Sequence, residues 1–333
     1  MGLSTTWIVT RTDKASMLKA LRLVETGEYE DSTLAPTAVA ELPDGWVVVH
    51  YSRMGQIDHD GIAAAFPRGE VLWGTSSETV MWSGAYGVQD GHQVWSVEHD
   101  PDKDLRGVST TGSPPEPFRT VLDDFVRQQE EEGDDQVDFI FEVPMALTTA
   151  LCGYDPTRQV GGVPFRVAEP MQSGAAGERQ AAAIALTKGL ASLIEGRLIP
   201  AAQELGFRTA DQMPDSPYRF DSPHTLVRFR DGLSEALTFF TRRDDGVARI
   251  GLDFFVRRGL EPRSGSLGVA IVPLPKQTLK EFFIGRKPEP AELTLERCAR
   301  EAQDLLQAVD QHLKSGTPHP HIRPASYSDE VKG

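Results

Sequence analysis

The chain has 333 residues, of which 39% are hydrophobic and 25% charged, so it can bury a sizeable core and is long enough for two domains. No run approaches the roughly 18 consecutive apolar residues of a membrane-spanning helix, and the first residues lack the basic start and apolar core of a secretory signal. Two cysteines, Cys152 and Cys298, are too few for a disulfide scaffold. These features predict a cytoplasmic protein with no membrane segment.

Charge is divided unevenly between the two halves of the chain. Residues 1–160 carry 11 Lys and Arg against 27 Asp and Glu, whereas residues 161–333 carry 23 against 22. All five tryptophans also lie in the first half. An acidic surface repels nucleic acid and anionic membranes but speeds the encounter with a basic protein. We therefore expect a protein partner of basic character, and neither nucleic acid nor membrane, unless the acidic charge serves solubility alone.

The first predicted elements are a strand over 6–10, a helix over 13–25 with Asp13 as N-cap, strands over 37–42 and 46–51, and a helix over 60–66. Asp44-Gly45 predicts a two-residue turn between the two later strands. That turn would set Ala40 opposite Val49 on a core face, with His50 on the other face.

The predicted architecture is organised around a hairpin over 69–100. Asp90-Gly91 between alternating apolar runs is a strong hairpin signal, because a type I′ turn needs φ > 0 at both central residues. A two-residue turn there would set Tyr86 opposite Trp95 and Trp82 opposite His99. One face would then carry Trp82, Tyr86 and Trp95, so the sequence predicts an aromatic face in the acidic half.

The first half continues with a strand over 105–111, a helix over 118–132, a buried strand over 137–143 and a helix over 145–151. We expect the first domain to span 1–155 and a Gly- and Pro-rich linker to span 156–172.

The second predicted domain, 173–314, opens with a long helix over 177–205 that Pro200 should kink or divide. Turns at Asp231-Gly232 and Asp245-Gly246 predict a three-stranded meander with Arg228 opposite Glu235. A strand over 266–272, a helix over 291–313 and a polar tail over 315–333 follow. Hairpins with helices beside them predict an α+β fold of two domains, each a mainly antiparallel sheet with helices packed on one face.

The sequence lacks the motifs that carry most catalytic mechanisms. It has no Walker A loop, dinucleotide-binding glycine motif, H-E-x-x-H, C-x-x-C or G-x-S-x-G. The acidic loop 100–104 begins like a calcium loop, but Leu105 occupies the position that needs glycine. Cys152 has no sequence neighbour that would stabilise a thiolate. We therefore expect no cofactor, no bound metal and no catalytic residue.

The histidines keep an enzyme alternative open. Four lie in the first half near acids such as Asp58, Asp60, Glu98 and Asp100: His50, His59, His92 and His99. A neutral imidazole beside carboxylates can bind a divalent metal or act as a general base. This alternative is a hydrolase, metal-dependent or not, with a pocket where His50, His92 and His99 converge.

The candidate binding residues are those of the aromatic face and the acids around it: Trp82, Tyr86, Trp95, Glu78, Asp90, Glu98, His99 and Asp100. Large aromatics at strand spacing are usually core residues, but on a surface they favour protein interfaces, where charge guides the encounter. The second half carries an arginine cluster that binds an anion, docks on the acidic half or solubilises a sheet face: Arg242, Arg243, Arg249, Arg257 and Arg258.

Three stretches of the first half carry a resemblance: Trp46-Val-Val-Val-His50, Trp95-Ser-Val-Glu-His99-Asp100 and Val137-Asp-Phe-Ile-Phe-Glu-Val-Pro144. This half resembles uncharacterised bacterial immunity proteins of polymorphic toxin, contact-dependent and type VI secretion systems. The second half, with Leu205-Gly206-Phe207 before its meander, is similar to a small bacterial domain family of unknown function. The resemblance implies a cytoplasmic protein that binds another protein. The charge asymmetry and the concentration of tryptophans in the first half favour an immunity protein that occludes a toxin's active site through its first domain. A hydrolase or a scaffold subunit of a larger assembly are the alternatives, and the oligomeric state stays open.

Overall fold

The computed structural model describes residues 4–29, 35–104, 107–132, 137–157, 163–209, 212, 224–230, 233–244, 247–258, 266–271, 291–315 and 322–324. The chain divides into two compact units. The first unit contains Met1–Glu25 and Glu30–Met171, and the second contains Thr26–Tyr29 and Gln172–Gly333. Among the described helices, none combines the length and the apolar composition needed to cross a bilayer.

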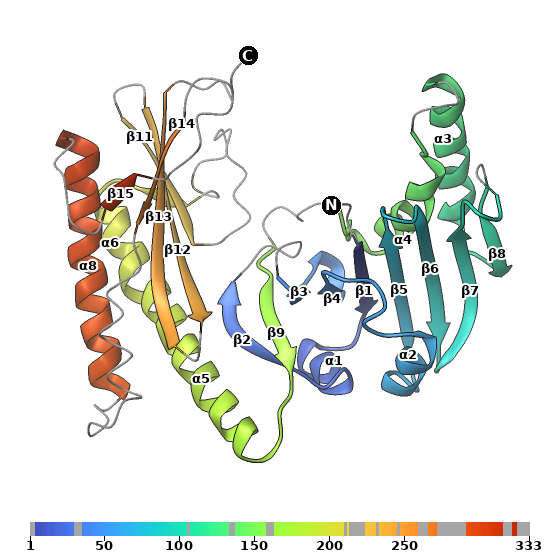
Figure 1. The fold of residues 1–333 in the computed structure, drawn as a ribbon, viewed down its shortest axis with the longest axis horizontal. Helices are drawn as coiled ribbons and strands as arrows, with labels where there is room; N and C mark the ends of the chain where they lie inside the picture. The colour runs from blue at the N-terminus through green and yellow to red at the C-terminus, as the bar shows by residue number, and fades with distance from the viewer. Residues whose placement is uncertain are drawn as a thin grey trace. The chain divides into compact units, whose positions relative to one another are not determined.

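The first sheet has nine strands in the order β2-β9-β3-β4-β1-β5-β6-β7-β8, and β8 lies at one edge (Figure 1). The strands are β1 Ser4–Thr10, β2 Leu23–Tyr29, β3 Thr37–Glu41, β4 Val47–Tyr51, β5 Glu70–Ser77, β6 Trp82–Gln89, β7 His92–His99, β8 Ser109–Gly112 and β9 Arg166–Pro170. Each neighbouring pair from β9 to β8 is antiparallel. Together with the helices, this sheet confirms the predicted α+β class.

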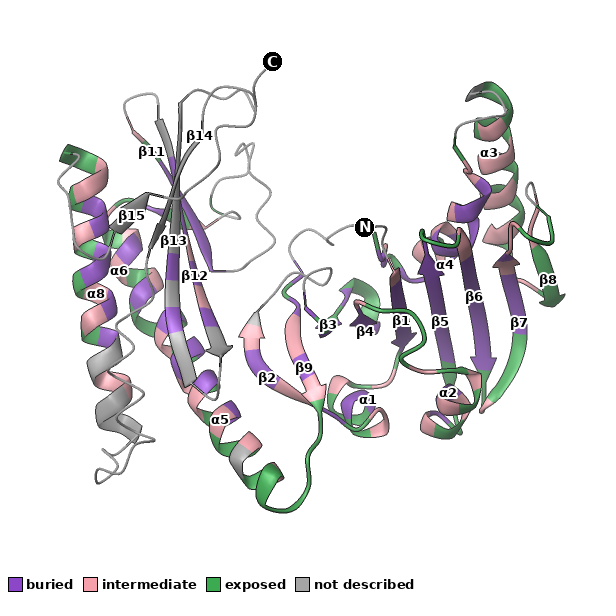
Figure 2. Cartoon of the chain, in the orientation of Figure 1, coloured by how far each residue is buried: buried purple, intermediate pink, exposed green. Residues whose placement is uncertain are grey.

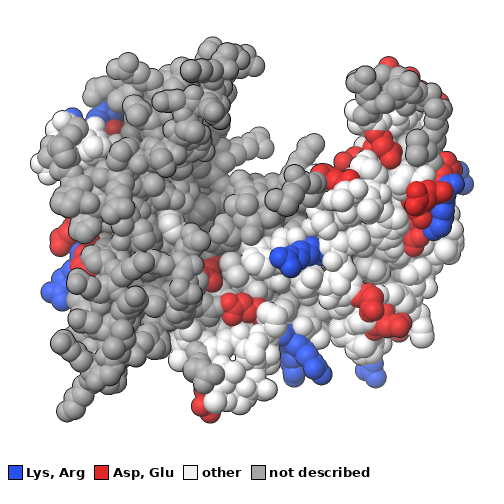
Figure 3. All heavy atoms as spheres, viewed as in Figure 1, with Lys and Arg blue, Asp and Glu red and all other residues white. Residues whose placement is uncertain are grey.

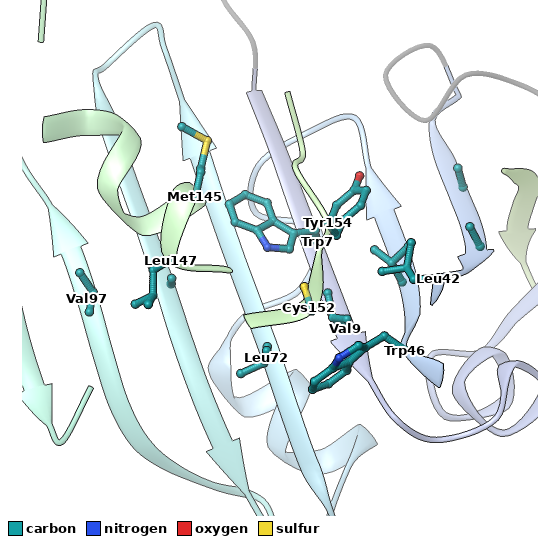
Figure 4. Packing of buried hydrophobic residues seen from close by; sticks show 14 of the residues in the cluster. Trp7, Val9, Leu42, Trp46, Leu72, Val97, Met145, Leu147, Cys152 and Tyr154 are labelled. Carbon is teal, nitrogen blue, oxygen red and sulfur yellow. The ribbon is translucent and has the colours of Figure 1, made fainter. Parts of the chain in front are cut away.

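Helices cover both faces of this sheet, so the prediction of helices on one face is wrong here. The helices are α1 Lys14–Ala20, α2 His59–Ala65, α3 Pro117–Glu132 and α4 Val143–Cys152. One core joins Trp7, Trp46 and Leu147 on the α4 side (Figure 4), and the other joins Ile8 to Met17 of α1 and Ile62 of α2. The physical reason is that strands such as β4 are buried at every position.

The hairpin at Asp90-Gly91 forms as predicted, with Gln89 opposite His92. Farther from the turn, the predicted register is wrong by one residue. A bulge between Gly87 and Val88 leaves Val94 as an extra residue on β7, so Trp95 pairs with Gly87 and Tyr86 pairs with Ser96. Because side chains alternate along a strand, a shift of one residue moves a side chain to the opposite face. The predicted single aromatic face is therefore divided between both faces.

The loop between β3 and β4 also differs from the predicted two-residue turn. Pro43–Gly45 form a 3₁₀ turn, and the Leu42 N–H donates to the Trp46 carbonyl at 2.7 Å. This longer loop sets Ala40 opposite Val48 instead of Val49. Ala40 and Leu42 consequently join Trp46 and Val48 in the core on the α4 side.

Three further predictions for the first half are corrected. The helix over 13–25 ends at Ala20, where Arg22 takes a positive φ of 54° and β2 begins. The expected strand over 137–143 is a 3₁₀ turn, Ile140–Glu142, that leads into α4, because an apolar run of this length suits a helix as well as a strand. The second part of the expected linker 156–172 is β9, which pairs with β3.

The second unit contains the predicted meander beside helices. Its helices are α5 Gly174–Leu193, the π turn η3 Ile194–Leu198, α6 Ile199–Glu204 and α8 Ala291–Ser315, and its strands are β10 Arg208–Thr209, β11 Thr225–Arg230, β12 Leu233–Asp244, β13 Val247–Arg258, β14 Ser266–Ile271 and β15 Ile322–Pro324. The π turn just before Pro200 confirms the predicted division of the long helix. The strands follow the order β10-β11-β12-β13-β14-β15.

The predicted register of the meander is confirmed, with Leu226 opposite Leu237 and Arg228 opposite Glu235. The core of this unit joins both leucines to Leu190 of α5 and Leu305 of α8. Within the expected tail 315–333, β15 pairs with β14, so that part is not a tail. The side chains of the predicted arginine cluster, and of Cys298, lie outside the described residues.

Candidate functional site

The sheet divides the predicted binding residues between its two faces. Trp95 lies with Trp7 in the core on the α4 side, and only 8% of it is exposed. Tyr86 lies in the opposite core with Trp73, and only 7% of it is exposed. The bulge at Val94 thus makes Trp95 a core residue that cannot share a surface with Tyr86.

A strand glycine makes the space that Trp95 occupies. Gly87 faces Trp95 across the β6–β7 pair, and a Cβ added to Gly87 would lie 2.0 Å from the indole Nε1. Gly74 accommodates Trp7 in the same way, because an added Cβ would lie 2.3 Å from its Cζ2. Both indoles therefore lie flat against the sheet in a closely packed core.

Tyr86, Trp82 and Glu98 are the predicted site residues that the sheet does bring together. Tyr86 stacks on Trp73 with ring centroids 4.2 Å apart, and half-buried Trp82 packs against the same core. Burial raises the pKa of the Tyr86 hydroxyl, and the charge of Glu98 and its hydrogen bond from that hydroxyl raise it further. Trp73 is not among the predicted site residues, although its spacing along β5 from Val71 places it on a buried face.

His99 is fully buried, and its hydrogen-bond contacts connect three segments of the chain. Its Nδ1 lies 2.9 Å from the Gly107 carbonyl and its Nε2 lies 2.9 Å from a carboxylate oxygen of Asp138. Both partner oxygens are hydrogen-bond acceptors, so each ring nitrogen of His99 contacts an acceptor. Asp138 also accepts from the Phe141 N–H at 3.2 Å. His99 thus holds β7 to the turn that begins α4.

The remaining predicted acids do not converge. Glu78 is exposed before β6, and Asp90 is exposed after it, so the eight-residue strand separates them by about 25 Å. Asp90 accepts from the Gly69 N–H at 2.8 Å, and this hydrogen bond lowers its pKa. Asp100 pairs with Lys103 at 2.9 Å, whose hydrogen bond lowers the pKa of Asp100. Asp90 and Asp100 thus stabilise turns at opposite ends of β7.

The histidines of the enzyme alternative lie apart as well. His50 is fully buried, with the Tyr154 hydroxyl 2.6 Å from its Nδ1 and the Thr5 hydroxyl 3.1 Å from its Nε2. His92 and His99 are the first and last residues of β7, about 23 Å apart along the strand. Within the described ranges, no three His, Cys, Asp or Glu residues are grouped so that they could hold a metal ion.

Acidic side chains gather instead at the β8 end of the first unit. Residues 98–132 contain ten Asp and Glu against four Lys and Arg. The apolar stripe of α3 packs against the core on the α4 side: Phe118, Val121, Leu122, Phe125 and Val126. This packing leaves three acids of α3 exposed: Asp123, Glu130 and Glu131. Figure 3 shows Asp and Glu side chains at this end of the first unit. We call β8, the turn 100–104 and α3 the acidic edge.

No protein-family model, curated protein or solved structure matches this chain.

Proposed function

We propose that the first unit binds a basic protein through the acidic edge, and that it acts in the cytoplasm as an immunity protein that neutralises a bacterial toxin. The observation that carries this proposal is the orientation of α3. Its apolar stripe packs against the core of the first unit, so Asp123, Glu130 and Glu131 face solvent. A surface of one charge selects partners of the opposite charge.

The charge distribution supports the same proposal. The acidic excess of the chain lies entirely in residues 1–160. Charge complementarity raises the association rate and excludes wrong partners more than it adds affinity. Exposed charges are screened over about 10 Å at 0.1 M ionic strength, so binding through the acidic edge should weaken as salt rises.

The residues of the first unit are also consistent with neutralisation by covering a toxin's active site. A protein that covers a toxin's active site needs a complementary surface but no catalytic group of its own. The described residues give the hydrolase alternative no converging histidines. The resemblance of the first half to immunity proteins supports the binding role as well.

The experiment compares two charge-reversal variants of the full chain. The first carries Asp123→Lys, Glu130→Lys and Glu131→Lys on α3, and the control carries three changes in the second unit: Glu178→Lys, Glu204→Lys and Asp304→Lys. All six side chains are exposed, so both variants change the net charge equally. Each immobilised protein is used to capture proteins from the source cells at low and raised NaCl.

The expected result is a basic protein that wild type and control retain at low salt, and that the α3 variant binds at least about tenfold more weakly. Expression of that protein alone should then be toxic, and expression together with this chain should be tolerated. Equal capture by the α3 and control variants would contradict binding through the acidic edge. A captured protein without toxicity would contradict the immunity role.

A further inference from the structure

We infer that the basic partner is held by strand addition: an extended segment of that protein pairs with the free edge of β8. This inference rests on the proposed function and names how the same surface holds its partner. It is argued from the backbone of β8, which the charge argument above does not use.

β8 is the terminal strand of the first sheet. It pairs on one side with β7, from Ser109 opposite Glu98 to Gly112 opposite Trp95, and no described strand pairs with its other side. All four of its residues are exposed, in contrast to buried β6 (Figure 2). In an antiparallel pair, every second residue points its N–H and C=O away from the neighbour. Such an edge is a template for another strand.

The edge is already formed before any partner binds. The Thr111 hydroxyl lies 2.8 Å from the Ser96 hydroxyl, so side chains as well as backbone hold β8 on β7. Gly112 ends the strand at a positive φ of 63°, close to the carbonyl of the bulge residue Val94. A preformed edge lowers the entropy lost on binding, which favours a short added strand.

β8 also lacks the residues with which proteins prevent such pairing. Its sequence, Ser109-Thr110-Thr111-Gly112, contains no Lys and no Pro. Its two threonines are β-branched and favour an extended backbone. The edge is therefore chemically open to a strand of suitable charge.

The charges near β8 determine which kind of extended segment can pair with it. The turn 100–104 precedes β8 with exposed Asp102 and Asp104, and half-buried Glu98 faces Ser109 across the strand pair. A second copy of this chain would bring another unit with the same acidic excess against this edge, which like-charge repulsion opposes. An extended segment with Lys or Arg near the Ser109 end is complementary, so the occupant is a basic segment of the partner.

The test separates backbone pairing from charge. Thr110→Pro and Thr111→Pro each remove one N–H, and alternation places one of these N–H groups toward β7 and the other away from it. The proline variant that keeps the unfolding free energy of wild type identifies the outward N–H. Thr110→Val and Thr111→Val control for loss of the hydroxyls. The probe is the basic protein retained in the salt-dependent capture, used in purified form.

We expect the stable proline variant to bind this protein at least about tenfold more weakly than the valine variant at the same position. If it binds equally while the α3 variant does not, strand addition is wrong and the proposed function stands. If neither the proline nor the α3 variant weakens binding, both are wrong.

Two further measurements cover the remaining outcomes. If both proline variants unfold, amide hydrogen exchange of wild type decides: exchange of the β8 amides should slow in the complex, and unchanged exchange overturns the inference. Light scattering of the free chain tests self-pairing. If wild type forms a dimer and the stable proline variant does not, the occupant of the β8 edge would be a second copy of this chain, and the inference would be overturned as well.

Discussion

At the scale of single residues, two strand glycines determine where the tryptophans of the first unit lie. Gly87 and Gly74 face Trp95 and Trp7, and neither leaves room for a methyl group. The sequence showed these glycines only as breaks in an alternating pattern. Their role became visible once the strand pairs were known, because the indole that needs the space comes from another strand.

Gly87→Ala should destabilise the first unit by about 1–3 kcal/mol, because its Cβ would lie 2.0 Å from Nε1 of Trp95 and must displace the ring. Urea unfolding followed by tryptophan emission measures the change. Gly196→Ala is the control, since an added Cβ there meets no heavy atom within 4 Å. Equal stability of the two variants would contradict the close packing of Trp95.

Cys152 illustrates how burial decides reactivity. Only 6% of it is exposed, and its thiol donates to the Thr148 carbonyl at 3.1 Å. Burial raises the pKa of the thiol to about 11, so almost no thiolate is present near neutral pH. In a Cys298→Ser background, Cys152 should resist iodoacetamide in the folded chain and react once urea unfolds it. Rapid labelling of the folded chain would show that this segment opens.

At the scale of elements, turn positions were predictable and strand register was not. Asp90-Gly91 and Asp44-Gly45 marked both loops, because these residues tolerate the φ values that tight turns need. A bulge has no such signature, since Val94 is an ordinary strand residue. The single aromatic face was lost through this one extra residue, and with it half of the candidate site. Asp138, the partner of His99, was missed because a long-range pair leaves no local pattern.

Deletion of Val94 should be tolerated better than deletion of any neighbour on β7. Because Val94 is the unpaired residue of the bulge, its removal leaves Gln93 opposite Val88 and Trp95 opposite Gly87. Deletion of Ser96 instead moves Trp95 or Val97 to the wrong face of the sheet. This should lower the unfolding free energy by about 4 kcal/mol or more. The unfolding free energies of the two deletions provide the comparison. A more stable Ser96 deletion would contradict the bulge.

Helix α8 is tied to β11 by a buried ion pair. Arg228 contacts Asp310 at 2.6 Å and also pairs with Glu235, the neighbour that the predicted register placed opposite it. Burial alone would raise the pKa of Asp310, but hydrogen bonds from Lys314 and Arg228 hold it below its ordinary value of 3.8. The stability from this lowered pKa is present above pH 3.8 and is lost as the pH falls through the folded-state pKa.

Asp310→Asn should therefore lower the unfolding free energy at pH 7 by about 2 kcal/mol, because it removes a buried charge partner of Arg228. The difference from wild type should shrink as the pH falls below the ordinary carboxyl pKa, where the wild-type side chain also becomes neutral. Urea titrations of both proteins at neutral and acidic pH measure this. A difference that stays constant with pH would contradict the ion pair.

At the scale of the whole molecule, the sequence predicted the charge asymmetry that the structure turns into a surface. Composition alone located the acidic excess in residues 1–160. It could not say that α3 would pack its apolar stripe against the core and leave its acids exposed, because that depends on how α3 packs. The sequence therefore predicted the charge of the proposed binding surface but not its geometry.

Self-repulsion among these acids should make the first unit respond to salt. NaCl screens charges of like sign, so it should raise the urea midpoint of wild type. The rise should be smaller in the variant with Asp123→Lys, Glu130→Lys and Glu131→Lys, which has less repulsion to screen. An equal rise in both proteins would show that the acids of α3 do not repel one another measurably.

The order of strands in the first sheet also bears on how the chain is made. β1 pairs with β4 and β5, which follow it closely in the chain, whereas β3 pairs with β9, at Arg166–Pro170. The backbone N–H and C=O groups on this side of β3 therefore stay unpaired while more than a hundred later residues are translated. Over that interval the nascent chain exposes an open strand edge to chaperones and to neighbouring chains, so slow synthesis between β3 and β9 is the stage at which misassembly is favoured.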